Sequence, residues 1–419
     1  MSNLYSYYTQ VIFLVFIVVN HMTEVYLSRR QLQTLQKHHA KVPAEFEHTL
    51  SIEDHQKAVR YSTAKLNFSQ LHLVWDAAVL FYWFPFRGAE KLYLSIPDWG
   101  MHREVLFLLA FSLIQMALNL PWSLYSTFVL EEKFGFNNST LKLFVTDRLK
   151  GMLLGVLIGV PLLYGLVALY EKLGTYWWLF GFIFLTLFQF ALVWIYPTYI
   201  APLFNKFKPL EEEELKSGIE KLVGNAGFKA QGVFVMDASK RSSHGNAYFT
   251  GFGKAKRVVF FDTLLKDLKT TEVLAILAHE LGHLKLKHIP KSLIASLVIS
   301  FLGFFLMGVL SKTTWFYTGH FVRVSSAGVL FLLFSQAIPL YTFWTTPFSS
   351  WISRRREFEA DAYAAKETDG KDLISGLLKL YQQNASPVVT DKIYSGFYHS
   401  HPPALERIKK LESLEAKPS

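Results

Sequence analysis

The stretch His279-Glu280-Leu281-Gly282-His283 places two imidazoles one helical turn apart, with a carboxylate between them. In an α-helix, residues four apart lie on the same face, so both rings can reach one metal ion. Glu280 then lies beside the remaining coordination position, an arrangement typical of zinc hydrolases. The stretch therefore predicts a helix with two zinc ligands, His279 and His283, and a catalytic base, Glu280.

The neighbouring residues favour a buried metal-binding helix over the simpler alternative of two surface histidines. Thr270 or Thr271 can cap the helix, and Glu272 suits the positive end of its dipole. Apolar residues at helical spacing surround the motif, namely Val273, Leu274, Ile276, Leu277, Leu281 and Leu284. Apolar packing of this kind would keep a metal site dry.

The composition indicates an integral membrane protein whose membrane part is all-α. Of 419 residues, 51% are hydrophobic and 18% are charged, and the apolar residues are clustered in long runs. A helix needs ~20 apolar residues to cross a bilayer. The runs predict seven membrane spans, near residues 8–27, 66–86, 104–125, 151–171, 176–198, 290–311 and 325–348.

Two of the predicted spans contain several polar residues: Asn20, His21 and Glu24 lie in the first, and His72 and Asp76 in the second. Polar side chains at membrane depth are costly unless they face one another or water. These residues therefore indicate a wet cavity inside the bundle. For Asn20, His21 and Glu24 the alternative stays open that they lie near a span end and reach the lipid headgroups.

The distribution of positive charge predicts the orientation in the membrane. Residues 28–65, residues 127–150 and the region after Pro197 are rich in Lys and Arg, whereas residues 1–8 contain neither. By the positive-inside rule, the N-terminus lies outside and the C-terminus lies in the cytoplasm. The net charge of +10 is explained by attraction to anionic lipids, and we expect no nucleic-acid partner.

This topology divides the chain into four parts. Residues 1–200 hold spans one to five with their cytoplasmic loops, and residues 290–348 hold spans six and seven. Residues 201–289 form a cytoplasmic metalloprotease segment, and residues 349–419 form a cytoplasmic C-terminal segment. Because both segments face the same side, residues of the second can complete a metal site that begins in the first.

The cytoplasmic segments show weaker secondary-structure signals than the spans. Two short strands are predicted at 232–236 and 257–262, separated by a polar, Gly-rich stretch at 242–253. A helix is predicted over 349–380 as a continuation of the last span. A sheet edge beside the zinc helix is a place where an extended peptide substrate could add as a further strand.

Catalytic zinc needs a third protein ligand in addition to two imidazoles. The chain has no cysteine, so the ligand must be a histidine or a carboxylate. Glu357, with Asp361 one turn later, offers a ligand and a supporting hydrogen-bond partner on one helical face. Glu359 is expected to point the other way, and His288 is not expected to bind the metal.

Four motifs together resemble a known family, the CAAX prenyl protease 1 group of integral-membrane zinc metalloproteases, of the Ste24 type, in peptidase family M48. The resemblance covers nearly the whole chain. The motifs stand in the family's order: HGNAYFTGF at 244–252, AHELGHLKLKH at 278–288, RRREFEADA at 354–362 and HPPALERI at 401–408.

The resemblance implies roles for the metal-binding and catalytic residues. It makes Glu357 the third zinc ligand and Asp361 its supporting acid. It also makes His401 and Arg407 catalytic residues, one or both of which would donate hydrogen bonds to the oxyanion of the transition state. From the residues alone, His401 is as well explained as a turn residue before two prolines, and Arg407 as a surface ion-pair residue.

The resemblance also assigns substrate binding to Asn246, Ala247 and Tyr248, although Asn246 could simply shape a turn. It implies seven long helices around a hollow, barrel-like chamber, with a small α+β zinc domain closing the cytoplasmic end. One Zn²⁺ per chain would serve peptide-bond hydrolysis near the C-terminus of prenylated or otherwise membrane-associated proteins. The expected partners are thus a peptide or protein substrate, which can carry a lipid, and membrane lipids.

Two other functions are alternatives to this one. A membrane quality-control protease of the HtpX type would use the same chemistry, and a non-catalytic membrane scaffold would keep only the fold. The intact set of His279, Glu280, His283 and Glu357 argues against a scaffold. The chain is shorter than eukaryotic members between the zinc helix and Glu357, and it lacks an endoplasmic-reticulum retrieval signal. These departures favour a bacterial inner membrane, with the endoplasmic reticulum as the location if the source is eukaryotic.

Overall fold

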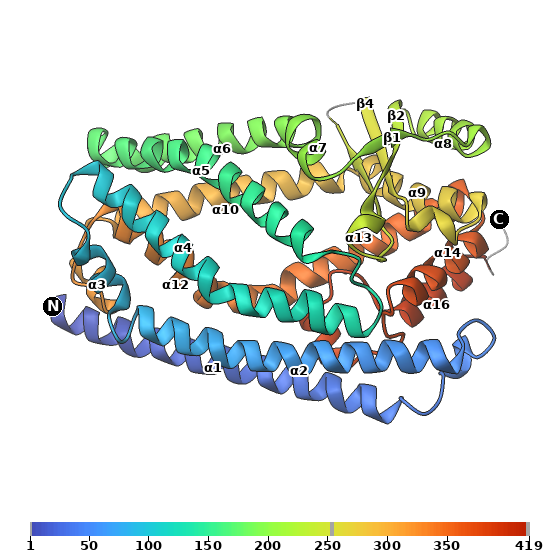
Figure 1. Cartoon of the computed structure of the whole chain (residues 1–419), viewed down its shortest axis with the longest axis horizontal. Coiled ribbons are helices and arrows are strands. Elements are labelled where there is room, and N and C mark those ends of the chain that lie inside the picture. The colour runs from blue at the N-terminus through green and yellow to red at the C-terminus, as the bar shows by residue number, and fades with distance from the viewer. Residues whose placement is uncertain (1, 252–254, 416–419) are drawn as a thin grey trace.

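The computed structural model describes residues 2–251 and 255–415 as an elongated helical body (Figure 1). The N-terminus lies at one end of the body and the C-terminus at the other. The long helices run along the body, and α1 and α2 lie side by side at one edge. A small sheet and a group of shorter helices are gathered at the end that holds the C-terminus.

The elements follow one another along the chain in three groups. The first group contains α1 (Ser2–Lys37), α2 (Ile52–Trp83), α3 (Gly88–Ser95), α4 (Met101–Tyr125), α5 (Leu141–Lys172), α6 (Trp177–Ile195) and α7 (Ala201–Phe204). The second contains β1 (Phe207–Pro209), α8 (Glu213–Asn225), β2 (Lys229–Met236), β3 (Ala247–Thr250), β4 (Ala255–Phe261) and α9 (Thr270–Lys285). The third contains α10 (His288–Leu310), α11 (Thr314–Gly319), α12 (Ala327–Thr342), α13 (Thr346–Glu367), α14 (Gly370–Gln383), α15 (Lys392–Tyr398) and α16 (Ala404–Glu415).

Within the described residues, six helical stretches are long and apolar enough to cross a membrane. They are Asn3–Lys37, Met101–Glu131, Leu141–Lys172, Gly174–Phe204, His288–Leu310 and Ala327–Glu367. The remaining predicted span, 66–86, lies mostly in α2, which is a long helix but too polar to be counted with these six. The sequence thus located the apolar helices, while the seventh span stays a prediction.

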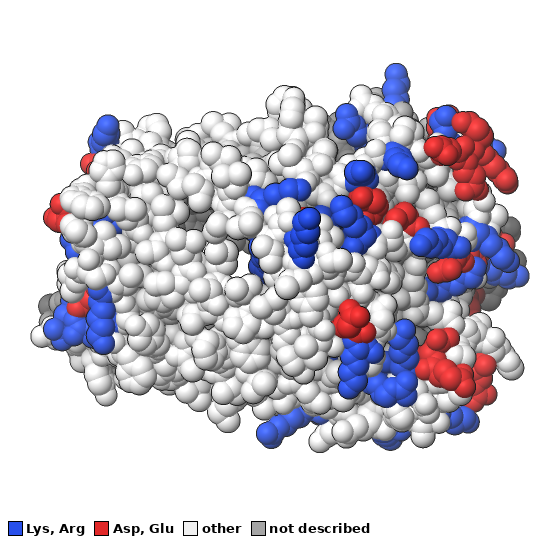
Figure 2. All heavy atoms as spheres, viewed as in Figure 1, with Lys and Arg blue, Asp and Glu red and all other residues white. Residues whose placement is uncertain are grey.

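The surface of the long helices is suited to lipid. In the most apolar parts of Leu141–Lys172 and Gly174–Phe204, only 6% of the residues are buried within the protein. Figure 2 shows the charged side chains gathered at the two ends of one face, with a broad uncharged band between them. An exposed apolar band of this kind is stable only in contact with a bilayer.

The sheet at the C-terminal end has four strands in the order β1-β2-β4-β3. β2 and β4 are parallel, and β1 and β3 pair antiparallel with them at the two edges. The two predicted strands correspond to β2 and β4. The prediction that 242–253 only connects them was wrong, because β3 forms within that stretch through pairing with β4. A strand of four residues with polar neighbours has no clear alternation of its own, so only its partner reveals it.

The predicted helix over 349–380 is divided into two helices. α13 ends at Glu367, and α14 begins at Gly370 after the N-cap Asp369, whose carboxylate accepts a hydrogen bond from the Lys371 amide at 2.9 Å. The break turns α14 back against α9. The start of α9 also differs from the prediction, because Lys269 and not a threonine precedes it.

Glu272 fixes the first turn of α9 as its acidic character predicted. Its carboxylate accepts hydrogen bonds from the Lys269 amide at 2.7 Å, the Ser375 hydroxyl at 2.7 Å and the Lys379 ammonium at 2.7 Å. Burial raises the pKa of Glu272, but these donors outweigh burial and leave the pKa below its usual value. Because Ser375 and Lys379 belong to α14, the same carboxylate anchors α14 to the histidine-bearing helix.

Candidate active site

The candidate site depends on a close crossing of α9 and α13. At Gly282, an added Cβ would lie 3.0 Å from the Ala360 Cα and 3.2 Å from the Ala360 carbonyl oxygen. A side chain at Gly282 would therefore force the two backbones apart. The small residues Gly282 and Ala360 allow this contact, which brings Glu357 next to the two histidines. In the sequence, 73 residues lie between His283 and Glu357.

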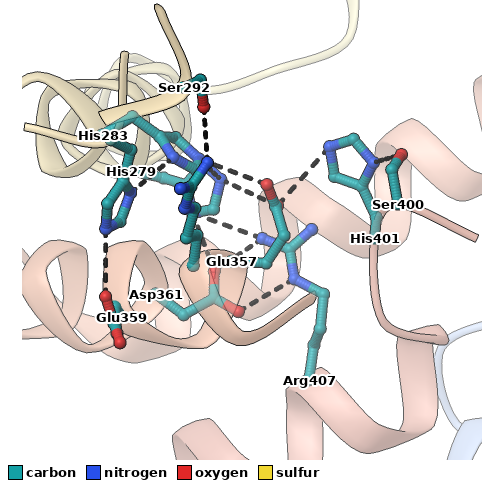
Figure 3. Close-up of polar contacts among 11 residues, drawn as sticks. His279, His283, Ser292, Glu357, Glu359, Asp361, Ser400, His401 and Arg407 are labelled. Atoms are coloured by element: carbon teal, nitrogen blue, oxygen red, sulfur yellow. Dashed lines mark hydrogen bonds and ion pairs between the residues drawn. The ribbon is translucent and has the colours of Figure 1, made fainter. Parts of the chain in front are cut away.

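Three side chains meet where the helices cross (Figure 3). Oε2 of Glu357 lies 3.3 Å from Nε2 of His279, and Oε1 lies 3.3 Å from Nε2 of His283. The two Nε2 atoms are 3.3 Å apart. These ligand atoms all lie within 4.8 Å of one another, and within the described residues they form the only such group of three. The structure thus brings together the three residues that the sequence analysis assigned to the metal.

The chemistry of the three side chains fits a divalent metal ion. Oε2 of Glu357 is buried and forms no hydrogen bond within the described part of the chain. A buried carboxylate oxygen without a donor is costly, and a cation between the three ligands would satisfy it. Two imidazole nitrogens and one carboxylate are also the donor set of catalytic zinc sites that keep a fourth position open for water.

The other nitrogen of His279 is held by a buried ion pair. Nδ1 of His279 lies 2.8 Å from Oδ1 of Asp361. Arg407 contacts both oxygens of Asp361, from Nη2 at 2.5 Å and from Nε at 2.9 Å. Asp361 is fully buried and Arg407 is nearly so. The carboxylate keeps the His279 proton on Nδ1, which leaves the Nε2 lone pair directed at the metal position.

The pKa of His279 shows how strongly these carboxylates act. Burial lowers it, but hydrogen bonds to Asp361 and Glu357 outweigh burial and raise it to about 9. In the absence of a metal, these carboxylates therefore favour a second proton on the ring, at Nε2. A metal ion must displace that proton when it binds.

The other nitrogen of His283 is held by a second imidazole. Nδ1 of His283 lies 3.0 Å from Nδ1 of His288, and Nε2 of His288 lies 3.0 Å from Oε2 of Glu359. As expected, neither His288 nor Glu359 joins the three metal-site side chains. The sequence analysis nevertheless missed both residues as neighbours of the site, because 71 positions separate His288 from Glu359.

His401 approaches Glu357 from the side opposite to His279 (Figure 3). Its Nε2 lies 3.5 Å from Oε2 of Glu357, and its Nδ1 lies 2.9 Å from the Ser400 hydroxyl. Partial desolvation beside the metal-site side chains lowers the pKa of His401. If Ser400 donates to Nδ1, the Nε2–H of His401 faces the centre of the site. The Ser400 contact could not be recognised from the sequence.

The segment that carries His401 is fixed to α13 by Arg354. Nη1 of Arg354 donates to the backbone oxygens of Ser395 at 3.1 Å, Gly396 at 3.2 Å and His399 at 2.8 Å. These carbonyls lie at the C-terminal end of α15, where the backbone oxygens of a helix have few partners of its own. Arg354 lies one turn before Glu357, so α13 positions both a metal ligand and the His401 segment.

Glu280 and Arg407 differ in their exposure to solvent. Glu280 is partly exposed. Arg407 instead lies on the Nδ1 side of His279, at 3.4 Å from that atom. Its guanidinium is therefore behind the imidazole and away from the metal-facing nitrogen.

The predicted substrate-binding residues lie at the edge of the sheet. Asn246 precedes β3, its side chain is exposed, and its backbone oxygen accepts a hydrogen bond from the Phe261 amide at 2.9 Å. Ala247 pairs with Phe260 and Tyr248 with Val259. The Tyr248 ring packs on the sheet face beside Phe261, with 6.4 Å between ring centroids. β3 is an edge strand of the sheet, so its outer backbone edge is open to pairing with an extended substrate.

A cavity of about 830 Å³ lies between the His401 segment and α2. It is lined by His401 and Asn246 from the site and by Tyr61 and Lys65 from α2. This volume is within the range of ligand-binding cavities and is large enough for a peptide of several residues.

Comparisons with known proteins agree with this arrangement. A family model described as "CAAX prenyl protease N-terminal, five membrane helices" matches residues 31–206, and one described as "Peptidase family M48" matches residues 209–415. The chain belongs to peptidase family M48. It is therefore a membrane metalloendopeptidase, and the resemblance inferred from the four motifs is confirmed.

Relatives of this M48 peptidase match it over nearly its whole length. A CAAX prenyl protease 1 homolog of Arabidopsis thaliana is 35% identical and covers 96% of this chain and 97% of its own. The CAAX prenyl protease 1 of Saccharomyces cerevisiae is 36% identical over 94% of this chain and 93% of its own. The crystal structure of S. mikatae Ste24p superposes with a TM-score of 0.89 at 35% identity, covering 96% of this chain and 98% of that one.

Proposed function

We propose that this M48 peptidase uses zinc to hydrolyse peptide bonds near the C-terminus of prenylated or otherwise membrane-associated proteins. The observation that carries the proposal is the meeting of His279, His283 and Glu357, near a cavity that is lined by His401 and by residues of α2. The names of the relatives support the substrate class. A site at the end of a membrane-embedded body is suited to a substrate held at the membrane surface.

His279, His283 and Glu357 would hold the zinc ion, leaving one position open. Zinc supplies a Lewis acid that lowers the pKa of a coordinated water and polarises the peptide carbonyl. Glu280 accepts a proton from the attacking water and passes it to the leaving amine. The exposed edge of β3, which begins beside Asn246, pairs with the extended substrate backbone.

We assign the oxyanion contact to His401 and not to Arg407. With Ser400 donating to Nδ1, the Nε2–H of His401 points toward Glu357 and can donate to the developing oxyanion. Arg407 donates from Nε and Nη2 to the two oxygens of Asp361, behind His279. Arg407 would therefore act through Asp361, as a positioning residue.

We further propose that α2 is the seventh span and that the helices enclose a hollow chamber with the small α+β domain at its cytoplasmic end. Few residues of α5 and α6 are buried within the protein. This supports helices that face lipid on one side and the chamber on the other. Termini at opposite ends of the body support an odd number of crossings. The N-terminus would lie outside and the C-terminus inside, in a bacterial inner membrane or, for a eukaryotic source, the endoplasmic reticulum.

The topology can be tested because the chain contains no cysteine. Asp98→Cys in the exposed segment after α3 should react with an impermeant reagent in intact cells. Lys41→Cys, in the exposed loop after α1, should react only after the membrane is permeabilised. Labelling of Lys41→Cys in intact cells would contradict the proposed orientation.

The function is tested by comparing cleavage of a farnesylated CaaX peptide with cleavage of its unmodified form. We expect zinc-dependent cleavage of both, faster for the farnesylated peptide. Glu280→Gln should lower kcat by about 10²–10⁴-fold while zinc content stays near one per chain, because it removes the base and keeps the ligands. Equal rates for the two peptides, with efficient cleavage of unfolded membrane proteins, would favour a quality-control protease. Glu280→Gln protein that cleaves normally would refute the mechanism.

A further inference from the structure

His288 is a buried imidazole that the proposed mechanism does not use. It is 3% exposed and has a partner at each ring nitrogen: His283 at Nδ1 and Glu359 at Nε2, both at 3.0 Å. We infer that Glu359 and His288 form a hydrogen-bond relay that fixes the tautomer and orientation of the metal ligand His283. The inference rests on the proposed metal site and assigns it two further positioning residues.

The order of donors and acceptors in the relay follows from the carboxylate at its end. A carboxylate only accepts hydrogen bonds, so Glu359 holds a proton on Nε2 of His288. Nδ1 of His288 then carries a lone pair and accepts the Nδ1–H of His283. As a result, Nε2 of His283 is left without a proton and directs its lone pair toward Glu357 and the metal position.

The backbone turn before His288 makes its contact with His283 possible. Lys287 adopts the left-handed conformation, with φ 59° and ψ 34°, between the end of α9 and the start of α10. This conformation costs roughly 1–2 kcal/mol for a residue with a Cβ atom. The turn places His288 at the first position of α10, directly against His283 five residues earlier. A left-handed residue is a common helix ending, and here it also brings the two imidazoles into contact.

Glu359 provides a second, independent reason. Its side chain is 42% exposed, so it contributes little to the hydrophobic core, yet it is directed at the buried nitrogen of His288. Arg355, which is 70% exposed, lies 3.3 Å from the other oxygen of Glu359. The carboxylate is thus placed where it can orient His288 while it remains partly hydrated.

The test measures zinc affinity of the purified full-length protein by competition with a chelator. His288→Phe keeps an aromatic ring but removes both nitrogens, and it should weaken zinc binding by about 10–100-fold. His288→Asn should recover most of the affinity, because its amide oxygen can replace Nδ1 as the acceptor for His283. Glu359→Gln should weaken binding by roughly threefold to tenfold in the wild-type background and have no effect in the His288→Asn background.

A matched control is Glu367→Gln, which removes the same charge from an exposed position of the same helix and should leave zinc affinity unchanged. Cobalt-substituted protein gives a second readout, since the visible bands of Co²⁺ should shift in His288→Phe and stay constant in Glu367→Gln. If His288→Phe does not fold, the surface variant Glu359→Gln still tests the relay.

Two results would overturn the relay. One is a zinc affinity within twofold of wild type for both His288→Phe and Glu359→Gln. The other is a failure of His288→Asn to bind zinc better than His288→Phe, which would mean that the ring acts by packing alone. Failure of the wild-type protein to bind zinc would instead refute the proposed function, so the two ideas are separated by the wild-type measurement.

Discussion

The two histidines of α9 are supported in different ways. His279 contacts the carboxylate of Asp361 directly, and that carboxylate is buried and paired with Arg407. Nδ1 of His283 reaches a carboxylate only through His288, and the carboxylate of Glu359 is partly exposed. Both arrangements leave the histidine Nε2 free for a metal. The carboxylate that supports His279 lies inside the protein, whereas the carboxylate that supports His283 lies at the surface.

The two carboxylates need different partners because one is buried and the other is partly exposed. A buried carboxylate loses its hydration and is stable only with a paired cation, which Arg407 provides. A partly exposed carboxylate keeps water and needs no such partner, but its effect is weakened by solvent screening. The Asp361 support should therefore be essential for both folding and metal binding, whereas the Glu359 support should only adjust metal affinity.

The largest expected effect comes from breaking the buried support. Asp361→Asn would leave the guanidinium of Arg407 buried without a counter-charge, so the free energy of unfolding should fall by about 3–5 kcal/mol. Zinc affinity should fall by about 10–100-fold or more. Denaturant unfolding of the metal-free protein and chelator competition measure the two quantities. The comparison fails if Asp361→Asn retains zinc better than Glu359→Gln.

A smaller effect is expected when the His401 segment loses its hydrogen bonds to α13 while Asp361 and Glu359 are unchanged. Arg354→Ala removes the donor that holds three backbone oxygens at the end of α15. We expect kcat to fall by roughly tenfold, because a misplaced oxyanion donor loses part of its 10²–10³-fold contribution. Zinc affinity should stay unchanged. Lys366→Ala, at an exposed position of the same helix, is the control, and loss of zinc in Arg354→Ala would show that the segment also supports the metal.

The smallest effect is expected at Arg355, which pairs with Glu359 at the protein surface. Arg355→Gln removes an exposed ion pair with Glu359, and exposed pairs contribute little to structure. Zinc affinity measured by the same competition should change less than twofold. A larger change would mean that Glu359 depends on its cation as Asp361 does, and the distinction between the two supports would no longer hold.

Site residues that are close in sequence could be predicted, whereas most contacts between distant segments could not. His279, Glu280 and His283 were recognisable because one helical turn sets their spacing. Glu357 and Asp361 were assigned as a pair by the same periodicity. His288 lies only five residues from His283, but its contact depends on the left-handed turn at Lys287, and nothing in the residue types signals that turn. Ser400 and Arg354 act on backbone and ring atoms that no motif describes.

The sequence by itself determined the apolar helices, the histidine-bearing helix and the family, because these depend on local periodicity and on residues at fixed spacing. Only the tertiary structure decided that α13 breaks at Asp369, that β3 forms at the sheet edge, and that Arg407 lies behind His279. The physical reason is that each of these features depends on a partner far along the chain. A carboxylate, an edge strand or a guanidinium acquires its role from what is packed against it.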